Sequence, residues 1–359
     1  MKKNFIALGL MSGTSLDGID AAILETDGEY FVNPGKFLSL PYNPRFRETI
    51  RSVLWENGPI ENVENQLTLL HAKAVSSLLE KAELKASDVD IIGFHGHTIL
   101  HDPDKGRTYQ IGDGALLAAK TNIDVVCDLR NNDVANGGQG APLVPLYHLA
   151  LAKKMDMPLV ILNIGGVANI TYLNGNELSL VAFDTGPGNA LIDDWVNSKL
   201  GKAYDQNGAI ASSGKVCQQV LNKYLSSKYF EKLPPKSMDR AEFKLSFLGD
   251  LSIEDGAATL TALTYESIKR SVCLLPNRPK RWLVTGGGRH NRFLMEKLSL
   301  VLKEKVEPVE VVGWMGDAIE AQAFSYLAVR SKKKLPITFP NTTGVRRPLS
   351  GGILYPKQV

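Results

Sequence analysis

Apolar runs separated by short polar turns are the clearest pattern in this chain, and the same arrangement occurs twice. The first apolar run covers residues 5–11, and after a turn of small and polar residues a second run covers 19–24. Residues 159–173 repeat this order around the pair Gly165-Gly166. Two short apolar runs joined by a tight turn predict a β-hairpin. The sequence therefore predicts two hairpins, each opening roughly half of the chain.

Between and after the hairpins, the spacing of apolar positions predicts a mixture of helices and strands. The clearest helix covers 62–84, whose apolar side chains gather on one side. A capping box at 252–255 precedes a second long helix at 257–274. Residues 331–359 show no strong element. Further helices are expected at 45–54, 115–120, 142–155, 190–200, 212–229, 292–303 and 318–330, and further strands at 90–94, 124–130, 178–183 and 282–285.

Length, charge and cysteine usage narrow the class of protein. A chain of 359 residues is long for one core and fits two domains. The formal net charge of +3 points neither to nucleic acid nor to a membrane surface as a partner. Cys127, Cys217 and Cys273 are scattered and form no C-x-x-C, which predicts free thiols in a reducing compartment. Because no stretch reads as a signal peptide or a membrane span, we expect a cytoplasmic protein.

The turn of the first hairpin, 12–18, offers groups that suit a phosphate. Gly13 and Gly18 permit close approach of the backbone, and successive turn N–H groups can form an anion-binding nest beside the hydroxyl groups of the turn. Asp17 and Asp20 would repel a bare phosphate, so their presence makes sense if a divalent cation lies between them and the phosphate. An ordinary hairpin turn rich in serine and glycine is the alternative.

The second hairpin supports the phosphate interpretation. Two lobes that each present a glycine hairpin to one ligand are the arrangement with which actin, Hsp70 and hexokinase-like proteins hold ATP. A third glycine run, 286–288, follows the strand 282–285 and precedes a helix, which again suits a nucleotide. The chain contains neither G-x-x-x-x-G-K-[ST] nor a G-x-G-x-x-G after its first strand, so a P-loop enzyme and a Rossmann dehydrogenase are disfavoured.

Asp184 is the candidate catalytic base. It follows the strand predicted at 178–183 and precedes a Gly-Pro-Gly turn and the helix at 190–200. A carboxylate at the carboxyl end of a strand, facing the other lobe, is placed to accept a proton from a nucleophile. The alternative makes Asp184 a helix cap or a turn residue.

Two polar loops are candidates for contact with a substrate. The loop 95–98 places two histidines around a glycine, and we interpret it first as a ligand-contacting loop, then as a structural turn, and only last as a metal site. The second loop, 131–142, could be a plain linker. However, the loop and the residues just before it carry a dense set of hydrogen-bonding groups that suit sugar hydroxyls and amides. That set consists of Asp128, Arg130, Asp133 and Gln139.

These segments together resemble the anhydro-N-acetylmuramic acid kinases. The specific motifs are Met-Ser-Gly-Thr-Ser-Leu-Asp-Gly at 11–18 and Phe-Asp-Thr-Gly-Pro-Gly-Asn at 183–189. The match continues, in the family's order and over nearly the whole chain, at 95–96, 110–113, 137–143, 163–169, 286–288 with Asn291, and 316–321. Two positions depart from the family pattern, since His97 stands where the family often has Gln and Arg289 where it often has Ala.

The resemblance implies a fold and a reaction. The fold would be α/β and two-lobed, actin/Hsp70/hexokinase-like and ribonuclease H-like, with the active site in the cleft between the lobes. We expect a first lobe at 1–140, a second at 141–335 and a tail at 336–359. With ATP and Mg²⁺, such an enzyme opens the 1,6-anhydro ring of anhydro-N-acetylmuramic acid with water and phosphorylates O6, giving N-acetylmuramic acid 6-phosphate in cell-wall recycling. The alternatives are a kinase of the same fold that phosphorylates an ordinary sugar hydroxyl, and a non-metabolic ATPase.

The resemblance also suggests the roles of individual residues. Asp184 matches the base that activates the attacking water. The nucleotide would contact Gly13, Thr14, Ser15, Leu16, Asp17, Gly18, Ile19 and Asp20 in the first hairpin, Gly165 and Gly166 in the second, and the glycines Gly286, Gly287 and Gly288. The sugar would contact His95, Gly96, Gln110, Asp128, Gln139 and Glu320. The ligands of the metal are left open, as is a homodimer.

Overall fold

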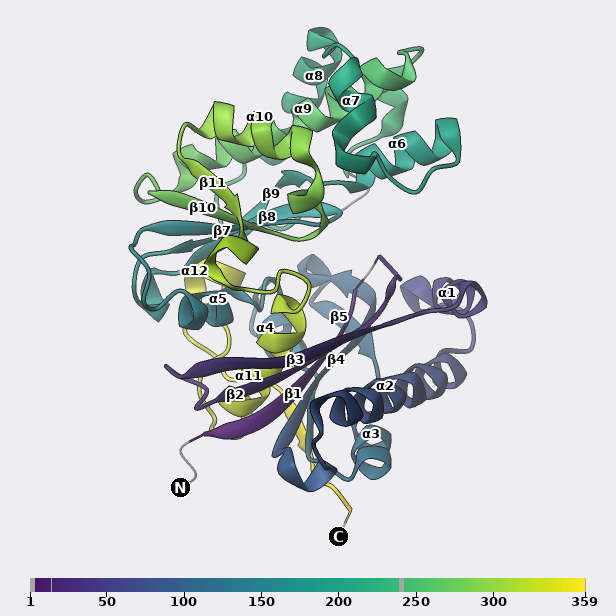
Figure 1. The fold of residues 1–359 in the computed structure, drawn as a ribbon, viewed down its shortest axis with the longest axis vertical. Helices are drawn as coiled ribbons and strands as arrows, with labels where there is room; N and C mark the ends of the chain where they lie inside the picture. Colours follow the sequence, from purple (N-terminus) through teal and green to yellow (C-terminus); the bar gives the residue numbers. More distant parts are fainter. Residues whose placement is uncertain (1–3, 14, 239–241, 359) are drawn as a thin grey trace. The chain divides into compact units, whose positions relative to one another are not determined.

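The structure, a computed structural model, describes residues 4–13, 15–238 and 242–358 (Figure 1). It divides the chain into two compact units, Met1–Lys154 with Asp317–Val359, and Met155–Gly316. The boundaries predicted at 140 and 335 differ from this division. The reason is helix α11 (Ile319–Lys332), which packs against the sheet of the first unit and brings the end of the chain back to it.

Seven strands among the described residues form the sheet of the first unit. Its order is β12-β6-β4-β1-β2-β3, with β5 paired to β4. β1, β2 and β3 are successive antiparallel neighbours, whereas β4 runs parallel to β1 and β6 parallel to β4. The strands are β1 (Phe5–Ser12), β2 (Gly18–Thr26), β3 (Val32–Pro41), β4 (Ile91–Asp102), β5 (Arg107–Ile111), β6 (Val125–Cys127) and β12 (Ile353–Tyr355).

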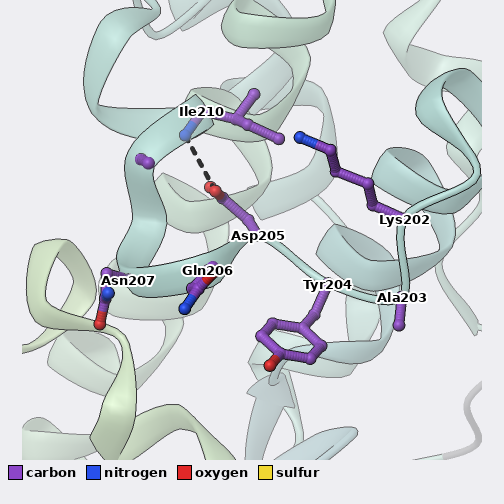
Figure 2. Close-up of a pocket in the computed structure, with 8 residues that line it drawn as sticks. Lys202, Ala203, Tyr204, Asp205, Gln206, Asn207 and Ile210 are labelled. Atoms are coloured by element: carbon purple, nitrogen blue, oxygen red, sulfur yellow. Dashed lines mark hydrogen bonds between the residues drawn. The ribbon is translucent and has the colours of Figure 1, made fainter.

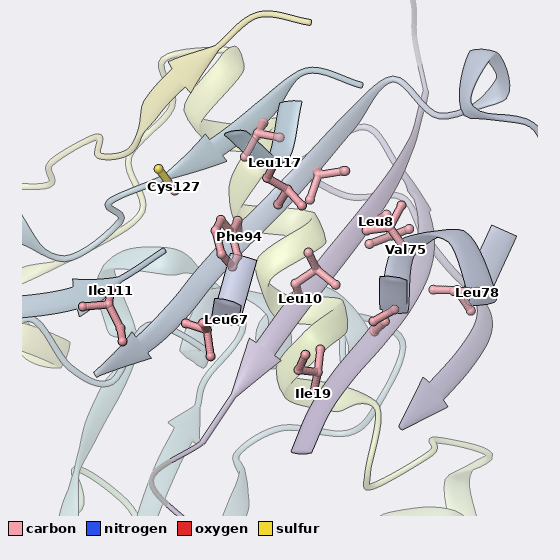
Figure 3. Packing of buried hydrophobic residues seen from close by; sticks show 14 of the residues in the cluster. Leu8, Leu10, Ile19, Leu67, Val75, Leu78, Phe94, Ile111, Leu117 and Cys127 are labelled. Carbon is pink, nitrogen blue, oxygen red and sulfur yellow. The ribbon is translucent and has the colours of Figure 1, made fainter. Parts of the chain in front are cut away.

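Helices cover both faces of this sheet. On one face, Leu67 and Val75 of helix α2 (Ile60–Ala82) pack on Leu8 and Leu10 of β1 and on Phe94 of β4, as Figure 3 shows. α11 lies against the other face. The remaining helices of this unit are α1 (Pro44–Arg51), α3 (Gly114–Thr121), α4 (Asn131–Ala135), α5 (Pro145–Leu151) and α12 (Pro340–Thr343).

Two glycines let α11 approach the sheet. A Cβ atom added to Gly9 would lie 1.8 Å from the carbonyl oxygen of Ala321, and one added to Gly93 would lie 2.0 Å from that of Phe324. Distances this short exclude any side chain at either position. The glycines therefore allow backbone-to-backbone packing that holds the start of α11 beside the first hairpin.

The second unit contains a five-stranded sheet in the described residues, with the order β11-β10-β7-β8-β9. The strands are β7 (Leu159–Ile164), β8 (Val167–Leu173), β9 (Val181–Pro187), β10 (Arg281–Thr285) and β11 (Lys305–Pro308). Apolar side chains of β7, β8 and β10 form one core with Ile268 of α9 (Ile253–Ser271) and with Leu294 and Leu298 of α10 (Arg292–Leu302). A second core joins α9 to α6 (Ala190–Leu200), α7 (Ala209–Ser213) and α8 (Gln218–Leu225).

Most predicted elements are present, including both hairpins and the capping serine of α9, Ser252, which accepts from the N–H of Asp255. Two predictions were wrong. The helix expected over 212–229 is divided into α7 and α8, because Gly214 is extended and packs so closely that a Cβ there would lie 2.1 Å from the carbonyl of Glu254. The tail expected to lack strong elements contains α12 and β12, and β12 pairs with β6.

Within the described residues, we find no helix with the length and apolar character that a membrane crossing requires.

Candidate active site

The turn between β1 and β2 presents backbone rather than side chains at several predicted nucleotide contacts. The N–H of Leu16 donates to the carbonyl of Gly13 over 3.0 Å, which closes the turn. The side chains of Leu16 and Ile19 are buried in the core of the first unit, so only the backbone of either residue can face a nucleotide. Thr14, another predicted contact, lies outside the described residues.

The two glycines of this turn have different surroundings. Around Gly13 the nearest atom to an added Cβ is Oγ of Ser15, at 3.6 Å, which leaves open space beside the turn. An added Cβ on Gly18 would lie 2.3 Å from the carbonyl of Leu40 on β3. Gly18 is therefore needed for packing between strands, whereas Gly13 leaves room for an anion.

Four carboxylates gather around the start of β2 and the start of α11. Burial raises the pKa of Asp20 to about 6, and the negative charges of Asp317 and Asp17 raise it further, against a hydrogen bond from Ser39 that lowers it. Burial also raises the pKa of Glu320, and so does the charge of Asp20. The sequence placed Asp17, Asp20 and Glu320 among the candidates. Asp317 was not among the predicted site residues, although it belongs to the motif 316–321.

Arg130 and His95 form the centre of a polar cluster in the same unit. Nε and Nη2 of Arg130 lie 3.1 and 2.9 Å from Nε2 of His95, and Nη1 donates to the carbonyl of Gly140 over 2.6 Å. Burial, then the charge of Arg130, holds the pKa of His95 well below its usual range, so the imidazole is neutral. The charge of Glu320 acts on Arg130, which links this cluster to the carboxylates. His95 and Glu320, both predicted sugar contacts, thus each interact with Arg130.

Other predicted sugar contacts have structural duties. Gly96 has a φ of 71°, and a Cβ there would lie 2.3 Å from the carbonyl of Ile111, so it serves the β4–β5 pairing. Asp128 accepts from the amide of Asn131 over 2.7 Å and acts electrostatically on Cys127, not on the Arg130 cluster. The amide of Asn131 therefore holds the Asp128 carboxylate.

Gln110 keeps an unused acceptor. Its Nε2 donates to Oγ1 of Thr108 over 2.8 Å, while its Oε1 is buried and without a partner among the described residues. Gln139 is fixed through its backbone, since its N–H donates to the carbonyl of Thr343 over 2.6 Å. Within the same loop, Asp133 accepts from the N–H of Gly140 and from the hydroxyl of Thr343, each over 2.6 Å. The loop 131–142 is thus a built structure and not a plain linker.

The two departures from the family pattern are both buried. His97 uses Nδ1 for Oγ of Ser12, over 2.9 Å, and the same Oγ lies 2.8 Å from the hydroxyl of Tyr42. Arg289 pairs with Glu310 over 2.9 Å and donates to the carbonyl of Gly286. One nitrogen of His97 binds Ser12, and one nitrogen of His95 binds Arg130. The histidines of the loop 95–98 therefore hold neighbouring segments of the first unit in place. The described residues contain no group of three side chains suited to a metal.

In the second unit, the predicted glycine turns meet at one place. The carbonyl of Gly165 accepts from the N–H of Asn189 over 2.8 Å, and that of Gly166 accepts from the N–H of Gly188 over 3.0 Å. Around Gly165 and Gly166 no atom lies closer than 3.4 Å to an added Cβ, which leaves the turn open. The hairpin is thereby fastened to the start of α6.

The triple glycine lies against the same hairpin. A Cβ on Gly286 would lie 2.6 Å from the carbonyl of Ile164, and one on Gly288 would lie 2.4 Å from the Ile164 side chain. Gly287 faces Asn189 with more room, at 3.7 Å. The three predicted nucleotide-binding glycines therefore lie beyond the carboxyl end of β10, next to Gly165 and Gly166 beyond the carboxyl end of β7.

The second unit also contains a pocket of about 530 Å³, lined by residues 202–207 with Ala209 and Ile210 (Figure 2). Asp205 shapes it by accepting from the N–H groups of Ile210 and Ala211, each over 2.9 Å. Gly208 packs on Asn291 at the start of α10, next to the triple glycine. The sequence at 205–208 shows only turn-forming residues, because a cap of this kind has no periodic signal.

Asp184 lies inside β9, not after its end. Its N–H donates to the carbonyl of Lys236 over 3.0 Å, and its Oδ2 accepts from the N–H of Met238 over 2.8 Å. Burial raises the pKa of Asp184 to about 7, against the lowering effects of the Met238 hydrogen bond and the charge of Lys236. The residue at the N-cap of α6 is Asn189, so the helix-cap interpretation of Asp184 was wrong. A carboxyl that titrates near neutrality can act as a general base.

Comparison with known proteins decides the family. The family model described as anhydro-N-acetylmuramic acid kinase matches residues 5–357. The protein of that name from Paramagnetospirillum magneticum is 52% identical over 350 residues, which cover 97% of this chain and 98% of that protein. The one from Zymomonas mobilis is 49% identical over 362 residues, covering 98% and 99%. This chain belongs to the anhydro-N-acetylmuramic acid kinase family.

Solved structures are similar at lower identity. The (R)-2-hydroxyglutaryl-CoA dehydratase component A of Acidaminococcus fermentans has a TM-score of 0.49 and 13% identity, covering 92% of this chain and 100% of its own. A ROK family glucokinase from Streptomyces griseus, in complex with glucose and AMPPNP, has a TM-score of 0.43 and 12% identity, covering 90% and 99%.

Membership of the anhydro-N-acetylmuramic acid kinase family confirms the family predicted from the sequence and the enzyme class, a phosphotransferase that uses ATP. The predicted α/β fold with two lobes is confirmed as well, since each unit is a mixed sheet with helices.

Proposed function

We propose that this chain is an ATP-dependent kinase that opens the 1,6-anhydro ring of anhydro-N-acetylmuramic acid with water and phosphorylates O6. The products are N-acetylmuramic acid 6-phosphate and ADP, which places the enzyme in the recycling of cell-wall sugars. The observation that carries the proposal is Asp184, a carboxyl whose pKa burial raises to about 7 within a family of that activity. A cytoplasmic location, a homodimer and an active site in a cleft between the lobes stay predictions.

Asp184 acts as the general base. It accepts a proton from water while the water oxygen bonds to the anomeric carbon and the bond from that carbon to O6 breaks. The freed O6 then attacks the γ-phosphorus, and the bond from that phosphorus to the bridging oxygen of ADP breaks. The N–H of Met238 keeps the carboxylate in one orientation, which is what positioned proton transfer requires.

The glycine turns fit the phosphates and the adenosine of ATP. Gly13, Gly165 and Gly166 each have open space where a side chain would otherwise stand, so their N–H groups can approach an anion. Gly287 and the pocket at 202–210 suit the adenosine end. Because the side chains of Leu16 and Ile19 are buried, only the backbone of these two residues can contact the nucleotide.

Mg²⁺ would bind together with the phosphates of ATP near the carboxylates of the first unit, since no three described side chains form a metal site by themselves. Burial, and then the charges of Asp317 and Asp17, raise the pKa of Asp20, and a cation would offset the repulsion between these carboxylates. We assign Asp17, Asp20 and Asp317 to the surroundings of the ion, with water completing its shell. When bound, Mg²⁺ neutralises charge that develops on the phosphates.

The sugar would be recognised by Arg130, which His95 holds in place, and by Glu320, with the unused Oε1 of Gln110 as a further acceptor. Arg130 is partly buried and charged, and such a group favours a ligand that carries a carboxylate or several oxygen atoms. Gly96 and Asp128 support this site only indirectly.

The product mass tests the proposal. The purified enzyme is incubated with ATP and the anhydro sugar in water enriched in heavy oxygen, and the product is analysed by mass spectrometry. We expect a phosphorylated sugar that has gained one water and carries the heavy isotope at the anomeric position. A phosphorylated product without added water would identify a kinase for ordinary sugar hydroxyls, and release of ADP without sugar would identify an ATPase; either result would overturn the proposal.

A further inference from the structure

One segment of the second unit, 229–238, makes three hydrogen bonds to Asp184. The hydroxyl of Tyr229 donates to the carbonyl of Asp184 over 2.6 Å. The carbonyl of Lys236 accepts from the N–H of Asp184, and the N–H of Met238 donates to its carboxylate. Backbone and side chain of the base are thus held by the same stretch of chain, which carries proline at 234 and 235 and belongs to neither a long helix nor a strand.

The side chain of Lys236 is buried within this segment, with only 8% of the residue exposed. Its Nζ donates to the carbonyl of Tyr229 over 3.4 Å and lies 4.6 Å from the centre of the Tyr229 ring and 5.8 Å from that of Phe183. A buried ammonium is costly unless a negative charge lies nearby. Asp184 supplies that charge, since it raises the pKa of Lys236 against the lowering effect of burial.

We propose that Lys236 is a positioning residue for Asp184: its carbonyl holds the main chain of Asp184, and its buried ammonium favours the charged form of the neighbouring carboxylate. The inference rests on the proposed function of Asp184 as the base. It extends that function, because nothing in the family comparison or in the motifs assigns a role to Lys236. The hydrogen bond of the Lys236 Nζ goes to the Tyr229 carbonyl, so the charge of Lys236 acts on Asp184 through space.

The other groups around Asp184 leave Lys236 as the cation that acts on it in the described part of the chain. Tyr229 is neutral, because burial raises its pKa far above the physiological range. Lys232 faces Lys236 and lowers the pKa of that lysine, and Glu242 acts on Tyr229. On the sheet, the residue opposite Asp184 is the uncharged Asn169 of β8.

The helix packed on this strand adds no charge to the base. Arg270 of α9 points to the ring of Phe230, with 5.6 Å to its centre, and donates to the carbonyl of Leu225 over 2.7 Å. Near β9, the same helix brings the hydroxyl of Ser267 close to Gly186. Removal of the Lys236 charge should therefore act on Asp184 without compensation from α9.

The test is the pH profile of turnover in Lys236→Met. This variant removes the charge and keeps most of the apolar stem between the rings of Tyr229 and Phe183. Loss of a nearby positive charge favours the neutral carboxyl, so we expect the acidic limb of kcat/KM for the sugar to move upward by about one pH unit. The kcat/KM for the sugar should then fall roughly tenfold near pH 6 and change little near pH 9, because kcat/KM reports the ionisation of the free enzyme.

Lys236→Arg is the matched control, because it keeps the charge and should retain the wild-type limb. If Lys236→Met does not fold, as judged by its thermal melt, Lys236→Gln provides a second neutral variant. An unchanged limb in a folded neutral variant would overturn the inference. So would an equal loss of rate at every pH, since a purely structural role predicts that result.

The inference and the proposed function can fail separately. An Asp184→Asn variant with near-normal turnover would remove the base itself and with it the role of Lys236. An inactive Asp184→Asn variant together with an unmoved limb in Lys236→Met would leave the base in place and refute only the role of Lys236.

Discussion

Arg130 and His95 are joined by a forked contact in which two guanidinium nitrogens, Nε and Nη2, lie 3.1 and 2.9 Å from Nε2 of the imidazole. Nδ1 of His95 lies 3.0 Å from the carbonyl of Gly96, so the neutral ring donates there and accepts from Arg130. The guanidinium also donates to Gly140. One side chain therefore ties β4 to the loop 131–142, and a planar fork is the group that can make all these contacts at once.

We expect Arg130→Lys to weaken sugar binding much more than ATP binding. Lysine keeps the charge near Glu320 but cannot reach His95 and Gly140 together, which leaves buried acceptors unpaired at about 1–3 kcal/mol. The KM for the sugar should rise by roughly tenfold or more, as measured by steady-state kinetics. Arg45→Lys, on the exposed start of α1, is the control and should behave as wild type. Equal effects on both substrates would contradict a role in the sugar site.

Gly13→Asp should abolish ATP binding in a folded protein. The turn has room for a Cβ, with the nearest atom 3.6 Å away, so the fold should tolerate the change. The new carboxylate, however, would lie where we place the phosphates and would repel them. Gly13→Asn has almost the same shape without the charge and is the matched control. Calorimetric titration with ATP should show no binding for the Asp variant and measurable binding for the Asn variant; equal affinities would refute a phosphate at this turn.

Gly9→Ala should destabilise the first unit. The added Cβ would meet backbone atoms of α11, 1.8 Å from the carbonyl of Ala321, and backbone cannot move aside cheaply. Overpacking of this kind typically costs about 1–3 kcal/mol. A thermal melt should show a transition lowered by several degrees, whereas Gly13→Ala, whose Cβ has space, should melt like wild type. Equal melts would mean that α11 is not packed as described.

Periodic patterns made the strands and helices of the site predictable. The hairpins β1–β2 and β7–β8 are visible because apolar runs flank turns of small residues, and α2 because its apolar positions share one face. The order of a strand, a glycine turn and a helix made Asp184 a candidate, and the family resemblance gave it the predicted role of base. These are local signals, and local spacing is what a sequence states directly.

Contacts between distant segments could not be predicted in the same way. β12 has three residues and pairs Ile353 with Cys127, so neither its length nor its spacing announces a strand. Lys236 and Met238 reach Asp184 from a charged, proline-containing connection without periodicity. The pairing of Arg130 with His95 likewise depends on β4 and β6 lying side by side, and a single sequence does not state strand order.

Asp184→Asn tests the base through stability as well as rate. In the unfolded chain an aspartate has a pKa of about 3.9, whereas burial raises that of folded Asp184 to about 7. The stability that the neutral carboxyl contributes is therefore complete below about pH 4 and is lost as the pH rises to about 7. Asparagine never ionises, so the melting temperature of the variant relative to wild type should increase over that range and stay flat above it. A difference that does not vary with pH would mean that Asp184 is not held near a neutral pKa.

The turnover of the same variant decides the role of Asp184 in the reaction. Asparagine can still accept the hydrogen bond from Met238 but cannot take a proton from water. Loss of a general base typically costs about 10²–10⁴-fold in rate. We expect the upper end of that range, because the same step also frees O6 for phosphoryl transfer. ATP affinity, measured by calorimetry, should change little, since the carboxylate serves the water and the sugar. A folded Asn variant that binds ATP and turns over at close to the wild-type rate would remove Asp184 from the mechanism.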